Sequence, residues 1–199
     1  MVEVRKILID EVESIVIIHE ESFNGFFLTT LGPVFLKMYY SVLLKSKRAI
    51  LVGFFINGRL EGFCSVAKDS RGFNAKLIKA NVISFFNMSI IILFTRPLSL
   101  IRLVMNLNKR NFVKDKGDYA EILSIAVSPS IQGRGAAKKM LLYIEKVLQK
   151  KGINRLSLTT DYFKNDKAIN FYKKSGYKIL YVFDSFPKRK MYRFLKNIN

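Results

Sequence analysis

The hydrophobic pattern of the C-terminal half predicts strands alternating with helices. In residues 121–128 the side chains of Ile122, Leu123, Ile125 and Val127 are apolar and mostly β-branched, as a buried strand requires. Pro129 ends that strand because proline cannot donate to a sheet ladder. The next segment, which runs to about Lys151, repeats apolar residues at helical spacing, and Gly152 stops it. The remaining elements expected here are a strand at Arg155–Thr160, a helix at Asn165–Lys174 and strands at Tyr177–Phe183 and Arg189–Leu195.

The pattern of the N-terminal half predicts a strand, two helices and a hairpin. Asn57-Gly58 separates two β-rich runs and is a strong hairpin signal. Pro33 suits the first turn of a helix, where its missing amide hydrogen costs little. In chain order, we expect a strand at Val2–Leu8, helices at Ile9–Phe23 and Gly32–Lys45, and the two hairpin strands at Ala49–Ile56 and Arg59–Val66.

The segment Ser70–Lys116 interrupts this alternation. It is helical in character, apolar from Val82 to Phe94 and basic after Thr95, and Pro97 is expected to divide it into two helices. Its apolar run is shorter than the ~20 residues that a membrane-spanning helix needs. The element order therefore predicts a single domain over residues 1–199 with a mixed α/β layer architecture and a helical insertion, at about residues 70–117, between its third and fourth strands.

The turn between the central strand and its helix has the chemistry of an anion site. The first N–H groups of a helix lack partners within the helix, and the helix dipole adds positive potential there. Gly133 and Gly135 let an oxygen-rich group approach the backbone closely, and Arg134 adds a charge that can reach a phosphate. The P-loop pattern fails because Ala136 follows Gly135, and the dinucleotide pattern fails because Lys138 stands at its last small-residue position.

The hexapeptide Gln132–Ala137 resembles the acetyl-CoA pyrophosphate motif, Gln/Arg-x-x-Gly-x-Gly/Ala, of the GNAT superfamily of acyl-CoA-dependent N-acyltransferases. The segment from Asn165 to Tyr177 is similar to a second GNAT pattern, Asn-x-x-Ala-x-x-Phe-Tyr-x-x-x-Gly-Phe/Tyr. Asn165 is a good helix N-cap, and Tyr172 lies about two turns further along nearly the same face. The predicted element order also matches the GNAT order, apart from the insertion, and the resemblance implies a mixed, mostly antiparallel central sheet flanked by helices.

The resemblance implies an acetyl-CoA-dependent N-acetyltransferase. In that arrangement the central strand separates from strand Arg155–Thr160, and the pantetheine arm enters the gap. Tyr172 lies near the sulfur and is expected to act as the general acid. The residues implied in cofactor binding are Ile125, Ala126, Val127, Gln132, Gly133, Arg134, Gly135, Ala136, Ala137, Asn165 and Phe171.

The reaction also needs a base, because deprotonating a lysine-like amine at pH 7 costs about 4.6 kcal/mol. Glu121 is the candidate: it lies eleven residues before Gln132, as the catalytic glutamate does in the histone-acetylating branch of the superfamily. The alternative is an edge carboxylate paired with a lysine. His19, the only histidine, is interpreted as a packing or surface residue, and Cys64 as a small core residue.

The acceptor site is expected near the first helix and the turn after it, with Glu20, Phe23 and Phe26 as candidate residues and Glu21 and Phe27 nearby. The stretch Ser22–Gly32 is similar to a bacterial GNAT group linked to surface-polysaccharide synthesis, which suggests an amino sugar, with or without a nucleotide, as acceptor. A protein or peptide amine and a polyamine remain open. No metal is expected.

The net charge of +19 favours anionic partners, although lysines spread along the chain also fit a solvated surface. The apolar and basic halves of the insertion together have the composition of an interfacial membrane anchor, but a lid over the acceptor site or a homodimer contact is the preferred interpretation. No module that binds nucleic acid is recognisable. The lone Cys64 excludes an internal disulfide and suits a reducing compartment, so we expect a cytoplasmic protein.

Overall fold

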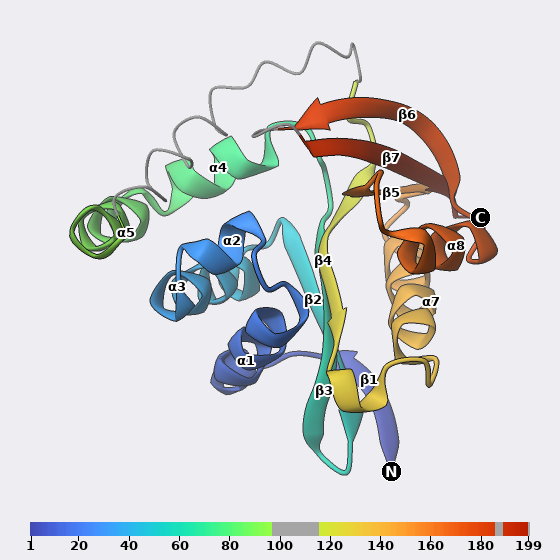
Figure 1. The fold of residues 1–199 in the computed structure, drawn as a ribbon, viewed down its shortest axis with the longest axis horizontal. Helices are drawn as coiled ribbons and strands as arrows, with labels where there is room; N and C mark the ends of the chain where they lie inside the picture. The colour runs from blue at the N-terminus through green and yellow to red at the C-terminus, as the bar shows by residue number, and fades with distance from the viewer. Residues whose placement is uncertain (97–115, 186–188, 199) are drawn as a thin grey trace.

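A computed structural model of the protein describes residues 1–96, 116–185 and 189–198, and in these it forms a seven-stranded sheet (Figure 1). The strand order is β1-β2-β3-β4-β5-β7-β6, and every neighbouring pair is antiparallel except β4 and β5. This confirms the predicted mixed, mostly antiparallel sheet. The strands are β1 Val2–Lys6, β2 Ala49–Ile56, β3 Arg59–Ala67, β4 Ala120–Val127, β5 Arg155–Asp161, β6 Lys178–Ser185 and β7 Arg189–Asn197.

Helices cover both faces of the sheet (Figure 1). On one side lie α1 (Val12–Ser22), α2 (Phe27–Thr30) and α3 (Pro33–Lys45), and on the other lie α7 (Ala136–Gln149) and α8 (Asp166–Lys174). The insertion contributes α4 (Phe73–Ala80) and α5 (Val82–Thr95), which extend from the α3 side. Two 3₁₀ turns, Ile9–Glu11 and Pro129–Ile131, precede α1 and the glycine-bearing turn.

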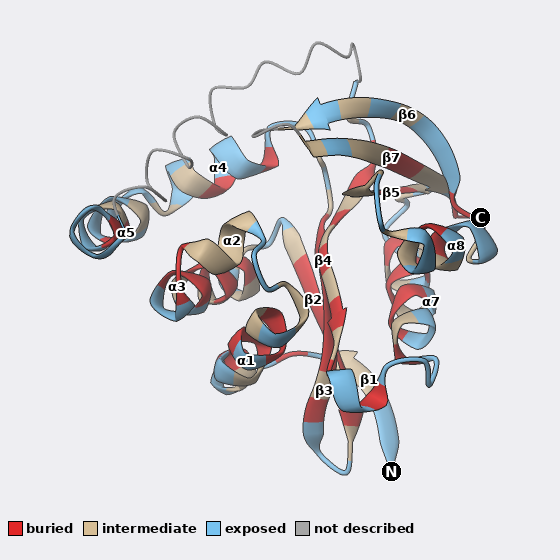
Figure 2. Cartoon of the chain, viewed as in Figure 1, coloured by how far each residue is buried: buried red, intermediate tan, exposed pale blue. Residues whose placement is uncertain are grey.

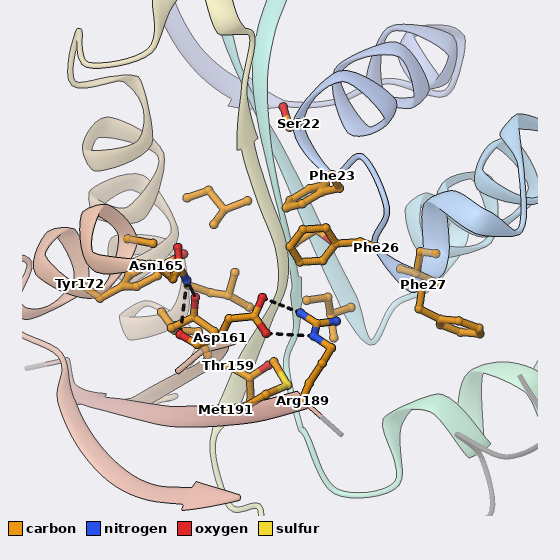
Figure 3. Close-up of a pocket in the computed structure, with 18 of the residues that line it drawn as sticks. Ser22, Phe23, Phe26, Phe27, Thr159, Asp161, Asn165, Tyr172, Arg189 and Met191 are labelled. Carbon is orange, nitrogen blue, oxygen red and sulfur yellow. Dashed lines mark hydrogen bonds and ion pairs between the residues drawn. The ribbon is translucent and has the colours of Figure 1, made fainter. Parts of the chain in front are cut away.

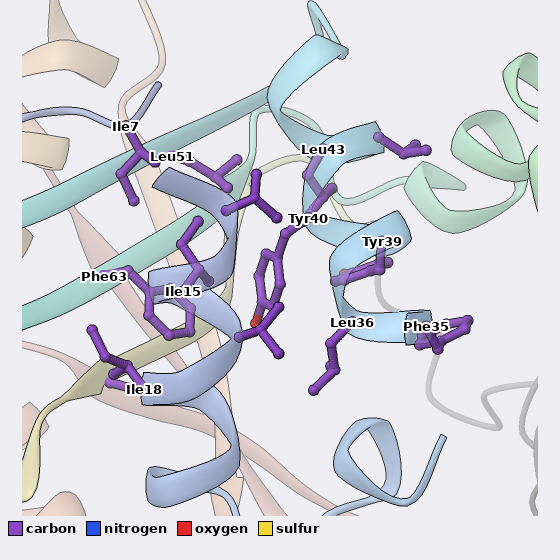
Figure 4. Close-up of a cluster of buried hydrophobic side chains, with 14 of the residues drawn as sticks. Ile7, Ile15, Ile18, Phe35, Leu36, Tyr39, Tyr40, Leu43, Leu51 and Phe63 are labelled. Carbon is purple, nitrogen blue, oxygen red and sulfur yellow. The ribbon is translucent and has the colours of Figure 1, made fainter. Parts of the chain in front are cut away.

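Each face of the sheet has its own apolar core (Figure 2). The α1–α3 core contains Ile15, Leu36, Tyr40 and Phe63, all without exposed surface. Figure 4 shows the Tyr40 ring between helices α1 and α3. The α7–α8 core contains residues such as Met140, Leu148 and Phe194. Fully burying one such side chain contributes roughly 1.5–3 kcal/mol, so each layer holds its helices against the sheet.

The insertion differs from the expectation in where it bends. Its break falls at Asn81, where α4 and α5 meet at 93°. Asn81 donates its side-chain amide to the Leu77 carbonyl at 2.9 Å and its backbone N–H to Ile78, so local bonds replace the continuing helix. The expected division at Pro97 lies outside the described residues, as do Arg102, Lys109, Arg110 and Lys114. The short helix α2 was not expected either.

The central strand is irregular at Leu123. Ser65 of β3 pairs with Ser124 and Val66 with Ile122, so Leu123 is an extra residue in β4, a β-bulge. The parallel pairing of β4 with β5 ends at the same place, with Ile122 opposite Leu158 as its last pair. Beyond it the two strands separate, which is the gap that the GNAT resemblance implies.

Candidate active site

A cavity of about 750 Å³ lies where β4 and β5 separate (Figure 3). Its walls come from α1 and the turn after it, the β4 residues around the bulge, the end of β5, the start of α8 and the start of β7. Five predicted site residues line it: Phe23, Phe26, Ile125, Asn165 and Tyr172. Segments that are far apart in the sequence thus converge at the gap in the sheet.

The glycine-bearing turn has the backbone that an anion site requires. Gly133 and Gly135 both have φ of +80°, and no atom lies within 4 Å of a Cβ built on either one. Lys139 donates the first regular bond of α7, to the Gly135 carbonyl at 3.1 Å, so the N–H groups of Ala136 and Ala137 precede the ladder. The turn can therefore accept a diphosphate closely against its backbone.

Side chains from α1 and from the glycine-bearing turn hold the end of the central strand. The Val127 carbonyl accepts the Gln132 side-chain amide at 3.3 Å and the Ser22 hydroxyl at 3.5 Å, so Gln132 braces the strand end. Ile125 lines the cavity, whereas Ala126 is buried in the α1–α3 core. The roles of Ile125, Ala126 and Val127 toward the pantetheine arm remain predictions.

Asn165 stands at the N-cap position of α8, but its side chain does not cap the helix. The amide nitrogen instead donates to the Thr160 hydroxyl at 2.5 Å and to the Asp161 carbonyl at 3.5 Å (Figure 3). The prediction that the Asn165 side chain caps α8 is therefore wrong. Asn165 ties the start of α8 to the end of β5, and this fixes one edge of the cavity.

Tyr172 lies about two turns along α8 from its start and lines the cavity. Its ring packs against Phe171 at 5.2 Å and Tyr177 at 5.9 Å between ring centroids. Burial raises the pKa of Tyr172 above its ordinary value, so the phenol keeps its proton at neutral pH. Tyr172 thus has the protonation state that a general acid needs, whereas Phe171 belongs to the α7–α8 packing and is not among the cavity-lining residues.

Both carboxylate oxygens of Glu121 are hydrogen-bonded to residues that do not line the cavity. Its Oε1 accepts from Arg193 Nη1 at 2.5 Å, and its Oε2 accepts from the Ser70 hydroxyl at 2.5 Å. Arg193 is buried and also donates to the Ser157 hydroxyl. The structure does not bring Glu121 into the cavity lining, so its role as base stays a prediction.

The acceptor side of the cavity contains residues that the sequence did not single out. Asp161 accepts two bonds from Arg189, at 2.9 and 2.7 Å, and the Arg189 guanidinium lies 4.9 Å from the Phe26 ring centroid (Figure 3). His19 also lines the cavity, but Glu20 does not, and Glu21 is exposed outside it. Asp161 could have been suspected, because it directly follows the predicted strand Arg155–Thr160 and lies four residues before Asn165, whereas Arg189 gave no local signal.

Comparison with known proteins identifies the class. The family model described as "Acetyltransferase (GNAT) family" matches residues 13–177, and the chain belongs to this family. A search of curated protein sequences finds no match. Among solved structures, a GNAT-family acetyltransferase from Desulfovibrio desulfuricans has a TM-score of 0.66 at 13% identity, covering 100% of both chains.

Two further neighbours are named for their chemistry. The ribosomal-protein-S18-alanine N-acetyltransferase of Escherichia coli has a TM-score of 0.62 at 15% identity, covering 100% of this chain and 95% of that one. The PaiA N-acetyltransferase of Thermoplasma acidophilum, solved with coenzyme A, has a TM-score of 0.56 at 16% identity, covering 99% of both chains. The predictions of family, fold, enzyme class and acetyl-CoA as cofactor are confirmed.

The residues present fit acetyl-CoA. The open backbone at Gly133 and Gly135, the start of α7 and the separated β4 and β5 offer a diphosphate site and a channel in one region of the fold. When bound, acetyl-CoA supplies an activated acetyl thioester. Among the described residues, no group of three or more His, Cys, Asp or Glu side chains is placed to hold a metal ion.

Proposed function

We propose that the protein transfers the acetyl group of acetyl-CoA to a primary amine that binds between α1 and β7. The cavity at the separation of β4 and β5 is the observation that supports this, because it puts Tyr172 and Asn165 on one wall and Phe23 and Phe26 on another. The new C–N bond forms as the C–S bond breaks, and one proton moves from nitrogen to sulfur. The expected setting is the cytoplasm.

In this proposal Gln132–Ala137 hold the diphosphate, Tyr172 keeps a proton at its phenol oxygen for the leaving sulfur, and Glu121 receives the proton of the amine. Because Glu121 does not line the cavity, that proton has to reach it through a relay. An amino sugar, free or nucleotide-linked, is the proposed acceptor. A peptide amine is the alternative, since the E. coli neighbour is named for an alanine of a ribosomal protein.

Acetyl-CoA in hundredfold excess over its Kd is expected to raise Tm by about 5–10 °C. Gly135→Val should weaken binding about tenfold, because valine is strained at φ +80° and fills the open space above the turn. Gly152→Val is the matched control: Gly152 lies just beyond the opposite end of α7 with φ +70° and equally open space. Acetyl-CoA turnover against glucosamine, UDP-glucosamine, an alanine peptide and spermidine then tests the acceptor. Absence of both the shift and turnover contradicts the proposal.

A second candidate function, binding at a membrane surface, is favoured by the exposure of α5. Seven of its large apolar side chains are exposed, and Phe94 (81%), Ile83 (74%) and Phe86 (64%) are the most exposed (Figure 2). Only Met88 and Ile92 of this helix are buried. Among the described residues no single helix is long and apolar enough to cross a membrane, and α4 and α5 pass that test only together, as a pair bent by 93°.

We expect vesicles containing phosphatidylserine to bind the protein more tightly than neutral vesicles, and added salt to weaken the binding, because the chain carries a net charge of +19. Ile83→Ser combined with Phe86→Ser should reduce vesicle binding about tenfold, since each removes apolar area from the lipid contact. Val34→Ser, at another exposed apolar residue, is the control. Binding that ignores lipid charge, salt and the α5 substitutions would exclude this function.

A further inference from the structure

His19 has a buried ring nitrogen with no partner among the described residues. The side chain is 2% exposed and lines the cavity, with Phe23 packed against it at 4.7 Å between ring centroids. Nδ1 is paired with the Tyr40 hydroxyl at 2.7 Å, but Nε2 is buried and unpaired. An unpaired buried polar atom costs free energy, so a group that reaches it from the cavity would be bound favourably.

The hydrogen bond between His19 and Tyr40 indicates which ring nitrogen of His19 carries the proton. Burial raises the pKa of the Tyr40 phenol well above its ordinary value, so Tyr40 keeps its proton at pH 7, and Nδ1 of His19, 2.7 Å from the hydroxyl oxygen, can accept it. The Tyr40 proton is then directed at Nδ1 of His19. Burial lowers the pKa of His19 to about 4, so the ring is neutral at pH 7 and its one proton lies on Nε2.

We propose that His19 Nε2–H donates a hydrogen bond to an oxygen of the amine acceptor, and that Tyr40 holds the ring in this tautomer. The inference deepens the proposed function and rests on it. It assigns the acceptor to amines that carry a hydroxyl or carbonyl oxygen near the reactive nitrogen, such as an amino sugar or a peptide, rather than to polyamines.

The charges of the cavity agree with this assignment. Its charged lining residues are Asp161, Lys164 and Arg189, and the Asp161 carboxylate already accepts both bonds from Arg189. No net negative charge among these residues attracts a polycation. A polyamine also presents only N–H donors when protonated, and these cannot pair with the N–H of His19.

The tautomer can be measured directly, because His19 is the only histidine and gives a single imidazole in a protein labelled with ¹⁵N-histidine. At pH 7 we expect the spectrum of the Nε2–H tautomer, and in Tyr40→Phe a mixture of both tautomers, since the group that fixes Nδ1 as acceptor is gone. A wild-type ring protonated on Nδ1, or charged at pH 7, would overturn the proposal whatever the enzyme's activity.

Kinetics tests the contact itself. We compare kcat/KM for UDP-glucosamine and for an alanine peptide with kcat/KM for spermidine, and expect the wild type to prefer at least one of the oxygen-bearing amines. The double variant His19→Leu with Tyr40→Phe replaces both members of a buried pair by apolar groups, which limits the loss of stability. It should lower this preference about tenfold, mainly through KM of the acceptor.

Two variants complete the test. His19→Gln should keep most of the preference, because its amide can accept from Tyr40 and still donate into the cavity. Tyr39→Phe, beside Tyr40 in the same core but outside the cavity lining, should leave the preference unchanged. A wild type that prefers spermidine, or a double variant with unchanged preference, refutes the role of His19. A wild type that acetylates none of the amines refutes the proposed function instead.

Discussion

Replacing Tyr172 by phenylalanine is expected to lower kcat about 100-fold, the lower end of what a positioned acid contributes. The phenol lines the cavity, and burial raises its pKa above the ordinary value, so it holds a proton wherever the enzyme works near neutrality. Phenylalanine keeps the ring packing against Phe171 and Tyr177, so Tm should change little. Steady-state rates and thermal unfolding of the same preparation measure both quantities.

Tyr177→Phe is the matched control for this variant. Tyr177 is also buried in the α7–α8 core, but its hydroxyl faces Glu145 at 3.5 Å and it does not line the cavity. We expect its kcat to stay within about a factor of three of the wild type, since the hydroxyl touches no reacting group. If Tyr172→Phe retains full kcat, the tyrosine only packs against its neighbours and another group supplies the proton.

Replacing Glu121 by glutamine is expected to lower the free energy of unfolding by about 3 kcal/mol, because it leaves the Arg193 charge buried without its partner. The two side chains are only 19% and 10% exposed. By contrast, the more exposed Arg189–Asp161 pair is expected to contribute about 1 kcal/mol. Urea denaturation of Glu121→Gln and Asp161→Asn measures the difference.

The double variant Glu121→Leu with Arg193→Met separates structure from catalysis. It removes both charges together, so most of the lost stability should return. If Glu121 is also the base, kcat remains low in this stable variant, mainly at low pH where the amine is most protonated. If stability and kcat recover together, the carboxylate is structural only, and the amine loses its proton to another group.

The parts of this molecule that the sequence predicts are those encoded locally. Asn57-Gly58 sets the β2–β3 hairpin, and the glycines before Ala136 set the open turn, so their positions follow from neighbouring residues alone. The family motifs predict the separation of β4 and β5, which the pairing confirms.

The parts that could not be predicted depend on contacts between distant segments. Arg193 and Glu121 are 72 positions apart in the sequence, and no local pattern near either residue predicts that they pair. His19 reads as a packing residue because a single histidine on an amphipathic helix gives no sign of Tyr40 or of the cavity behind it. Asn81 ends α4 with a hydrogen bond from its side-chain amide to the Leu77 carbonyl. Whether an asparagine ends a helix in this way depends on its surroundings, so the sequence alone does not predict it.

The bulge at Leu123 restricts how this stretch of chain can change in length. It places Ile122 and Ile125 on the α7 side, three residues apart, where plain alternation would put them on opposite faces. Deleting Leu123 would remove the bulge and leave the other residues on their present faces, whereas adding a residue between Leu123 and Ser124 would turn Ser124 into the apolar α7–α8 layer. The length of α5 and its flanks does not affect this register, but one residue inserted within 124–127 would exchange the side chains that face the two cores.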